Sequence, residues 1–326
     1  MKYRRLGNSG LKLSEVGLGS WVTFGKQIDL STGKQIMQEA YDAGINFFDN
    51  AEGYEEGEAE RLMGDAIASL GWSRDTFVLS SKAFWGGEKP TQKGLSRKHI
   101  FDACHAALKR LRVDYLDLYY CHRPDIDTPI RETVWAMHDL VSQGKVMYWG
   151  TSEWNAQQIT EAISVAKADK LHMPIVEQPE YNLLKRDKVE GEYRPLYALY
   201  GLGLTTFSPL ASGRLTGKYS NGIPKGSRLD LPEYAWLKEL FFEDDSWVQK
   251  VKLLSQLASQ YDIPLHHLAL KWVLANPNVS SVILGVSKLS QLTDNLSALA
   301  REPLDSGLIN SIESIVDNKP NEPQRF

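Results

Sequence analysis

Strand-length apolar runs alternate with helix-period stretches along most of the 326 residues. Apolar residues in the longer stretches recur every three or four positions, as in amphipathic helices, and two of these stretches stop at Gly44 and Gly71, a common helix end. A strand followed by a helix, repeated along a chain, builds a parallel sheet. The expected strands are Val16–Gly19, Ile45–Phe48, Phe77–Lys82, Leu116–Cys121, Val146–Gly150, Ile175–Gln178, Leu204–Ser208 and Val282–Gly285.

Eight such units predict an α/β fold of the closed (β/α)8 TIM barrel type. An open doubly wound sheet is the alternative, but it usually carries GxGxxG in its first βα turn, whereas residues 17–25 read GLGSWVTFG. Two segments fall outside the repeat: a short N-terminal hairpin around Tyr3–Leu6 and Leu11–Leu13, and a long irregular loop, Pro209–Leu231, after the seventh strand. The expected helices cover residues 33–43, 58–70, 97–111, 131–143, 155–168, 193–199, 247–260, 265–275 and 289–298.

The charge balance and the cysteines exclude several classes of protein. Lys and Arg number 37 against 41 Asp and Glu, so the net charge of −4 gives no reason to expect a nucleic-acid partner. Cys104 and Cys121 are too few for a disulfide framework or a thiolate metal site, and no metal is expected. The first ten residues lack a signal-peptide core, and no apolar run is long enough to span a membrane. We therefore expect a cytoplasmic protein without membrane insertion.

Seven consecutive predicted strands end in or next to a polar residue. In a parallel barrel the carboxyl ends of all strands lie at one face, where barrel enzymes carry their chemistry. Each of these residues taken alone is equally consistent with an ordinary cap or turn. In chain order they are Asp49, Lys82, His122, Ser152, Gln178, Ser208 and Ser287.

The first three of these residues, together with Tyr54, form a more specific set. A phenol ordinarily has a pKa of about 10, and an adjacent Lys82 ammonium favours the phenolate of Tyr54 and lowers that pKa. Asp49 would keep the ammonium charged, and His122 would hydrogen-bond and orient a carbonyl oxygen. The set suits protonation of a developing alkoxide while a hydride arrives from the other side. The alternative is a buried Lys–Asp pair with Tyr and His as amphipathic rim residues.

Eight segments form recognisable motifs. They are GLGSWVTFG (17–25), FFDNAEGY (47–54), SSK (80–82), YYCHRPD (119–125), WGTSEW (149–154), PEYNLL (179–184), FSPLASGRLTGKY (207–219) and GVSKLSQLTDN (285–295). With them the chain resembles the aldo-keto reductases over essentially its full length. WVTFG, MYWGTS and SPLASG resemble in particular the branch of the voltage-gated potassium-channel β subunits and their bacterial relatives. The resemblance implies one aldo-keto reductase barrel domain over residues 1–326.

The resemblance also implies a cofactor and a set of catalytic residues. The cofactor would be NADPH/NADP+, bound in an extended form across the barrel mouth. Tyr54 would donate the proton. The implied catalytic residues are Asp49, Tyr54, Lys82 and His122.

Further residues of this chain match positions that hold the cofactor in that family. Ser152 and Gln178 would hold the carboxamide, and Tyr181 would stack on the nicotinamide ring. Lys218 would join the loop along the pyrophosphate, and Arg228 would meet the 2′-phosphate. The implied cofactor-binding residues are Ser20, Trp21, Gln27, Asp49, Ser152, Gln178, Tyr181, Phe207, Ser208, Pro209, Leu210, Ala211, Lys218, Arg228, Gly285, Ser287, Gln291, Asp294 and Asn295.

Two departures from the channel-subunit branch bear on function. That branch often has Asn at the position of His122, and the His of ordinary reductases favours a competent enzyme. Glu153 follows Ser152 where mammalian β subunits have Arg, which changes the charge near the cofactor.

Three functions are open at this stage. The first is an NADPH-dependent reduction of aldehydes, with ketones as further carbonyl substrates, to alcohols. The second is a redox-sensing β subunit with slow turnover and an ion-channel partner, a less favoured reading; the branch includes tetramers and larger homo-oligomers. The third is another barrel chemistry, either a Schiff-base lyase using Lys82 or a glycosidase using Asp49 and a second carboxylate. Trp21, Phe84, Trp85 and Trp154 are candidates for the lining of a substrate pocket or for loop anchors.

Overall fold

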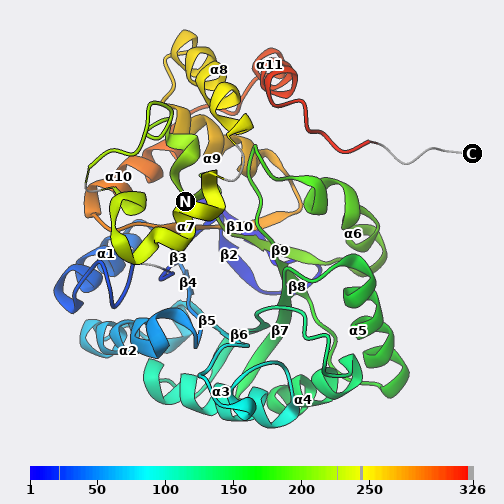
Figure 1. Cartoon of the computed structure of the whole chain (residues 1–326). Helices are drawn as coiled ribbons and strands as arrows, with labels where there is room; N and C mark the ends of the chain where they lie inside the picture. Colours follow the sequence, from blue (N-terminus) through cyan, green and yellow to red (C-terminus); the bar gives the residue numbers. More distant parts are fainter. Residues whose placement is uncertain (22, 226, 243–244, 322–326) are drawn as a thin grey trace, which may run out of the picture. The chain divides into compact units, whose positions relative to one another are not determined.

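The computed structural model describes residues 1–21, 23–225, 227–242 and 245–321 (Figure 1). They divide into two compact units. The first unit comprises Met1–Glu180, Glu192–Phe207 and Pro277–Thr293. The second comprises Tyr181–Gly191, Ser208–Asn276 and Asp294–Phe326. The single domain expected over residues 1–326 stays a prediction.

Eight parallel strands of the first unit form a closed barrel, which confirms the predicted (β/α)8 architecture. Each strand pairs with its neighbours in chain order, and the eighth pairs with the first, so the barrel has no free edge. Nearly every strand residue is buried, as expected of a parallel sheet that is covered on both faces. The strands are β3 (Val16–Gly19), β4 (Phe47–Asp49), β5 (Val78–Ala83), β6 (Leu116–Cys121), β7 (Val146–Ser152), β8 (Val176–Gln178), β9 (Gly203–Thr206) and β10 (Val279–Gly285).

The predicted N-terminal hairpin is also present, as the antiparallel pair β1 (Tyr3–Arg5) and β2 (Lys12–Ser14). Leu6 and Leu13 of this hairpin belong to one buried apolar cluster with Phe47 and Val176, which begin strands of the barrel. The hairpin therefore packs at the amino end of the strands and leaves their carboxyl ends to the loops.

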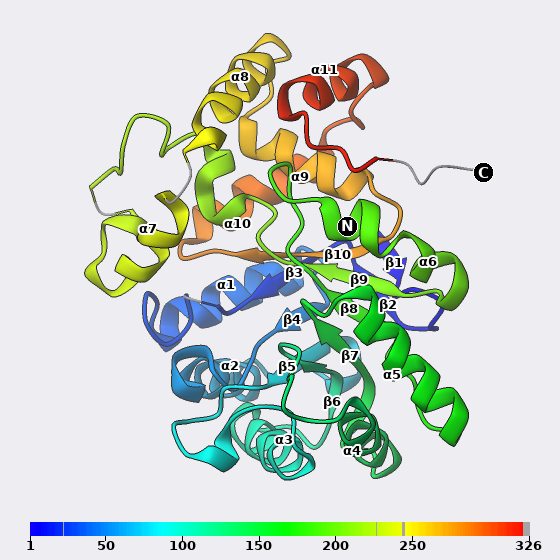
Figure 2. The same cartoon turned by 45° about the vertical axis from the view of Figure 1, so that its right-hand side comes forward.

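Helices of the first unit cover the outside of the barrel (Figure 2). Asn155 caps α5 as predicted, because its side chain accepts from the backbone N–H of Gln158 and the Gln158 side chain accepts in return. The first helix starts three residues earlier than predicted, since Asp29 caps it through the N–H of Thr32. The helices are α1 (Leu30–Asp42), α2 (Glu58–Leu70), α3 (Arg97–Leu111), α4 (Ile130–Ser142), α5 (Ala156–Asp169), α6 (Arg194–Tyr200) and α10 (Leu289–Ser297), the last of which continues into the second unit.

The second unit holds the long segment after the seventh barrel strand and the C-terminal helices. The predicted irregular loop is a series of tight turns rather than open coil, and two helices that the sequence analysis omitted, α7 and α11, belong to this unit. Its regular elements are η5 (Ala211–Thr216), η6 (Arg228–Asp230), η7 (Pro232–Tyr234), α7 (Ala235–Phe242), α8 (Ser246–Gln260), α9 (Leu265–Ala275) and α11 (Ser306–Val316).

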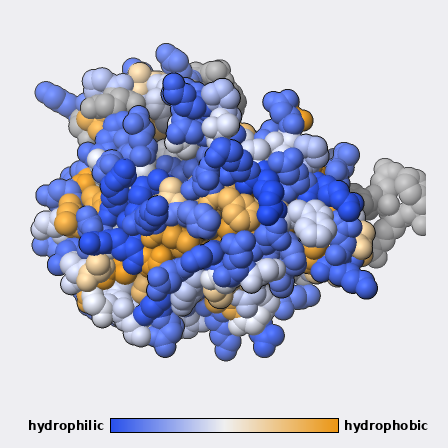
Figure 3. Space-filling view, turned by 90° about the horizontal axis from the view of Figure 1, so that it is seen from below, coloured by the Kyte–Doolittle hydropathy of each residue, from blue (hydrophilic) through white to orange (hydrophobic). Residues whose placement is uncertain are grey.

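The surface mixes hydrophilic and hydrophobic side chains. Seen from below, hydrophobic side chains reach the surface between hydrophilic ones (Figure 3). Isolated exposed apolar residues such as Trp135 and Met147, each 38% exposed, are normal for protein surfaces and carry no functional argument. Within the described residues, no helix is long and apolar enough to cross a membrane.

Candidate active site

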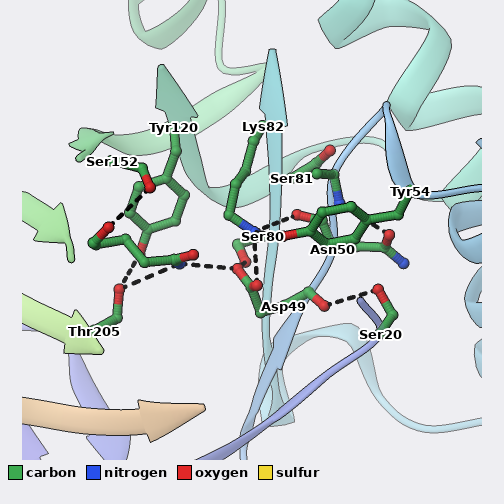
Figure 4. Close-up of polar contacts among 12 residues, drawn as sticks. Ser20, Asp49, Asn50, Tyr54, Ser80, Ser81, Lys82, Tyr120, Ser152 and Thr205 are labelled. Atoms are coloured by element: carbon green, nitrogen blue, oxygen red, sulfur yellow. Dashed lines mark hydrogen bonds and ion pairs between the residues drawn. The ribbon is translucent and has the colours of Figure 1, made fainter. Parts of the chain in front are cut away.

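A chain of polar contacts joins Asp49, Lys82 and Tyr54 at the carboxyl ends of β4 and β5. Lys82 Nζ lies 2.6 Å from Asp49 Oδ2, 3.2 Å from the hydroxyl oxygen of Tyr54 and 2.8 Å from the carbonyl oxygen of Asn50 (Figure 4). Asp49 ends β4 and pairs in register with Ser80, two residues before Lys82. Side chains two residues apart on a strand share a face, so the barrel register itself brings the lysine to the carboxylate.

Asp49 is held by more partners than the sequence analysis foresaw. Ser80 Oγ donates to Asp49 Oδ1 at 2.7 Å, and Gln178 Nε2 donates to the same oxygen at 3.2 Å. Ser20 Oγ donates to the Asp49 carbonyl oxygen at 3.1 Å. Ser80 was the residue missed. Its signal is its spacing, since it stands two positions before Lys82 in SSK and must face the same interior.

The loop that presents Tyr54 has an unusual backbone. Glu55 and Glu56 have φ values of 48° and 53°, and Gly57 follows at 88°. Non-glycine residues rarely adopt this left-handed region. Such strain persists where the surrounding structure holds the backbone in place, and it is often found at active sites. The turn ends at α2, so the strained residues fix the phenol between the strand end and the helix.

Burial and charge set the protonation of the Lys82–Tyr54 pair. Burial lowers the pKa of Lys82, but Asp49 and Tyr54 raise it, and the net pKa lies above the ordinary value. Burial raises the pKa of Tyr54, and the nearby Lys82 ammonium lowers it without outweighing the burial. Lys82 acts on the pKa of Tyr54 in the predicted direction, and burial, which the sequence did not show, outweighs it. Tyr54 is a neutral phenol and Lys82 an ammonium at neutral pH.

His122 follows β6 directly and lies beside the phenol. Its ring centroid is 5.6 Å from that of Tyr54 and 4.9 Å from that of Trp85. Burial, then the charges of Lys82 and Arg123, hold the pKa of His122 well below its usual range, so the imidazole is neutral at pH 7. Its Nδ1 is buried without a hydrogen-bond partner among the described residues.

The other predicted cofactor residues of the barrel unit lie at or just beyond strand ends. Ser152 ends β7, and its hydroxyl donates to the Gln178 carbonyl oxygen at 2.8 Å. Ser287 follows β10, and its backbone N–H donates to the Gln291 side chain at 2.9 Å. The remaining members of this group, all placed at barrel-strand ends or in the segment after β3, are Ser20, Trp21, Gln27, Phe207 and Gly285.

In the second unit, the predicted pyrophosphate segment forms a compact turn. Ser208, Ala211 and Ser212 have φ values of 52°, 47° and 54°, and Gly213 follows at 101°. Turns of left-handed and right-handed residues recur at anion sites. Here the backbone N–H groups of Ala211 and Gly213 donate to the carbonyl oxygens of Ser208 and Leu210. A Cβ placed on Gly213 would lie 3.4 Å from Lys218 Nζ, so the ammonium stands next to this turn. The predicted residues Pro209 and Leu210 complete it.

Tyr181 lies in the second unit and is 1% exposed. Its ring packs against Trp272 with centroids 5.2 Å apart, and its hydroxyl donates to Glu190 at 2.6 Å. Burial, then the charge of Glu190, raises the pKa of the phenol far above its ordinary value. The stacking of Tyr181 on a nicotinamide ring stays a prediction.

Asp294 is occupied by two adjacent histidines of the second unit. Its carboxylate lies 2.7 Å from His266 Nε2 and 3.1 Å from His267 Nε2, while His267 Nδ1 accepts from Arg301 at 3.2 Å. Because Nδ1 of His267 accepts, its Nε2 carries the proton and donates to Asp294. Asn295, the residue after Asp294, is buried. The side chain of Arg228 lies outside the described part of the structure.

Comparison with known proteins decides the family. The sequence profile described as "Aldo/keto reductase family" matches residues 15–317. The chain belongs to the aldo/keto reductase family. It is 52% identical over 328 residues to a protein of Oryza sativa subsp. japonica named "Probable voltage-gated potassium channel subunit beta". It is 51% identical over 328 residues to a protein of the same name from Arabidopsis thaliana, and each alignment covers 100% of both chains.

Family membership makes the protein an oxidoreductase, and the geometry disfavours the two other barrel chemistries. A Schiff-base lysine must lose its proton to act as a nucleophile, whereas Asp49 and Tyr54 raise the pKa of Lys82 against the effect of burial. A glycosidase needs a carboxylate free to meet a sugar. Both oxygens of Asp49 accept hydrogen bonds instead, from Lys82 on one side and from Ser80 and Gln178 on the other.

Proposed function

We propose that this aldo/keto reductase reduces aldehydes, and ketones as secondary substrates, to alcohols with NADPH. The observation that carries the proposal is the buried Lys82 ammonium, which contacts Asp49 at 2.6 Å and the phenol of Tyr54 at 3.2 Å. A neutral phenol beside an ammonium can give its proton to an alkoxide, because the cation stabilises the phenolate that remains. An ion pair that served only the fold would not need the phenol of Tyr54 beside the Lys82–Asp49 pair.

Each residue has a separate task in this mechanism. When bound, NADPH would supply the hydride that the carbonyl carbon accepts. Tyr54 gives its hydroxyl proton to the carbonyl oxygen, and Lys82 stabilises the phenolate until it is protonated again. Asp49 keeps Lys82 charged and in place. Neutral His122, next to the phenol, donates a hydrogen bond that orients the carbonyl oxygen.

The residues present fit a dinucleotide phosphate. Lys218 supplies a cation beside the left-handed turn at Ser208–Gly213, a kind of turn that recurs at anion sites. Within the barrel unit, Ser152 and Gln178 are the residues that would hold the carboxamide of the cofactor. We keep the further cofactor assignments, including Arg228, as part of the proposal.

Replacement of Lys218 by Met should weaken NADPH binding. Lys218 is exposed, so its charge-assisted contact with a phosphate should contribute about 10-fold in affinity at low salt and less at high salt. Fluorescence titration with NADPH at two ionic strengths measures this. Lys225→Met, which removes an exposed lysine of the same segment, is the control, and equal dissociation constants for the two variants would contradict the assignment.

The wild type should bind NADPH more tightly than NADH.

His122→Asn should slow reduction while leaving NADPH binding within a few-fold. Asn can donate to the carbonyl oxygen but lacks the reach and shape of the imidazole, so we expect about a 10²-fold lower kcat/KM. Because the lowered pKa keeps His122 neutral above pH 6, wild type and variant should show parallel kcat/KM profiles between pH 6 and 8. A wild-type step near pH 6.5 that the variant lacks would show that the imidazole titrates instead.

The names of the two plant relatives support a second candidate function, that of a β subunit of a voltage-gated potassium channel. Such a protein would bind NADPH and act through a channel partner with slow turnover. The intact set of Asp49, Tyr54, Lys82 and His122 favours the enzyme. Failure to oxidise bound NADPH with any aldehyde, together with co-purification of a potassium channel, would favour the β subunit. We keep a cytoplasmic location, one domain over residues 1–326 and homo-oligomers as parts of the proposal.

A further inference from the structure

Arg123 lies next to the residues of the proposed chemistry but has no role in it. It follows His122 at the end of β6, and its Nη1 donates to the His122 carbonyl oxygen at 2.5 Å and to Ser152 Oγ at 3.3 Å. Its Cζ is 5.4 Å from the ring centroid of Trp85, which itself contacts the His122 ring. The guanidinium is therefore held between a backbone carbonyl, a hydroxyl and an indole.

Arg123 has no acidic counter-ion in the part of the chain that the structure describes. Within the described residues no carboxylate forms an ion pair with it, although most other arginines on the barrel unit have one. The acidic residue nearest in the chain, Asp125, instead accepts from the backbone N–H groups of Leu95 and Asp127 and from the Thr128 hydroxyl. A partly desolvated guanidinium without a counter-ion favours an anion from outside.

The guanidinium is close enough to act on the carbonyl site. Its charge contributes, after burial and Lys82, to the lowered pKa of His122, and it also acts to lower the pKa of Tyr54. Trp85 is 43% exposed and Arg123 is partly exposed, so both side chains are in contact with solvent. An anion bound there would lie a few atoms away from a carbonyl group between Tyr54 and His122.

We propose that Arg123, positioned on Trp85, binds an anionic group of the substrate. The preferred substrates are small aldehydes that carry a carboxylate or a phosphate a few bonds from the carbonyl. Both groups match the planar fork of a guanidinium. This inference rests on the proposed reductase function and adds the substrate class to it.

The test compares an anionic aldehyde with its neutral counterpart. We expect wild-type kcat/KM to be higher for 4-oxobutanoate than for its methyl ester, and higher for glyceraldehyde 3-phosphate than for glyceraldehyde, with the advantage falling as salt is added. Arg123→Met should lower kcat/KM for the anions about 10- to 100-fold, mainly through KM, and change the neutral compounds less than about threefold. The arm with the larger loss tells whether carboxylate or phosphate is preferred.

Three controls keep the result interpretable. Arg123→Lys keeps the positive charge but lacks the planar guanidinium, so it should retain part of the preference for anionic over neutral aldehydes. Arg61→Met removes an exposed arginine of α2 and should leave the preference unchanged, which excludes a general charge effect. NADPH affinity should stay the same in Arg123→Met.

Two outcomes would overturn the inference. One is an equal loss on anionic and neutral aldehydes in Arg123→Met, and the other is a wild type that shows no preference for the anions. Both differ from a failure of the proposed function, in which the wild type would reduce none of the four compounds.

Discussion

Tyr54→Phe should lower aldehyde reduction about 10²- to 10⁴-fold, the usual range for loss of a positioned acid. The change keeps the ring and removes only the hydroxyl that lies 3.2 Å from Lys82 Nζ. NADPH affinity and the melting temperature should therefore stay close to wild type. Steady-state kcat/KM on a panel of aldehydes, with NADPH binding measured separately, shows whether the loss lies in chemistry.

Tyr120→Phe is the matched control. Tyr120 is also a buried phenol of the barrel, and Lys82 Nζ lies 5.9 Å from its ring centroid, but its hydroxyl pairs with Thr205 at 2.9 Å. Its removal should change kcat/KM less than about 10-fold and cost about 1 kcal/mol of stability. If Tyr54→Phe kept turnover near the wild-type level, or if both variants lost equal activity, Tyr54 would not be the acid.

Lys82→Met should damage both activity and stability. Without the ammonium the pKa of Tyr54 rises further, because burial and Asp49 raise it and only the charge of Arg123 then opposes them. The phenolate left by proton transfer also loses its hydrogen-bonded cation. We expect a loss of reduction comparable to that of Tyr54→Phe. The buried carboxylate of Asp49 is also left uncompensated, which typically costs about 3–5 kcal/mol of folding free energy.

The double variant Asp49→Asn with Lys82→Met separates the two effects. It removes both charges, so urea denaturation should show most of the lost folding free energy restored. Activity should stay as low as in Lys82→Met, since the phenol still lacks its cation. Recovery of activity along with stability would mean that Lys82 serves only the fold.

A further variant, Tyr54→Phe with Lys82→Met, should reduce aldehydes little more slowly than either single variant, because the lysine acts through the phenol.

The barrel could be predicted from the sequence because its signals are local and repeated. The helices Glu58–Leu70 and Arg97–Leu111 begin and end in the structure where the apolar period and Gly71 indicated. The helix α11 was missed, although Leu308, Ile312 and Val316 recur every four residues behind a capping Asp305. This helix lies after the eighth barrel strand and its own helix, so the strand–helix repeat does not require it.

The sequence was enough to predict which residues form the site, but not how burial and charge set their pKa values. The order of strand ends brought Asp49 and Lys82 together, as their buried 2.6 Å contact shows. The pKa of Tyr54 depends on how deeply the phenol is buried, and that depends on the strained loop at Glu55 and Glu56, which no residue pattern announces. The surroundings of Arg123 could not be predicted either, because the sequence does not show that Asp125 accepts hydrogen bonds from Leu95, Asp127 and Thr128.

We propose that this protein transfers a hydride from NADPH to an aldehyde with Tyr54 as the acid. Stopped-flow mixing of the NADPH-loaded protein with aldehydes tests this proposal, with NADPH deuterated at C4 of the nicotinamide. We expect rapid loss of the nicotinamide absorbance in wild type, deuterium in the product alcohol, and a decay about 10²- to 10⁴-fold slower in Tyr54→Phe. Bound NADPH that no aldehyde oxidises, or an equal decay in wild type and Tyr54→Phe, would contradict it.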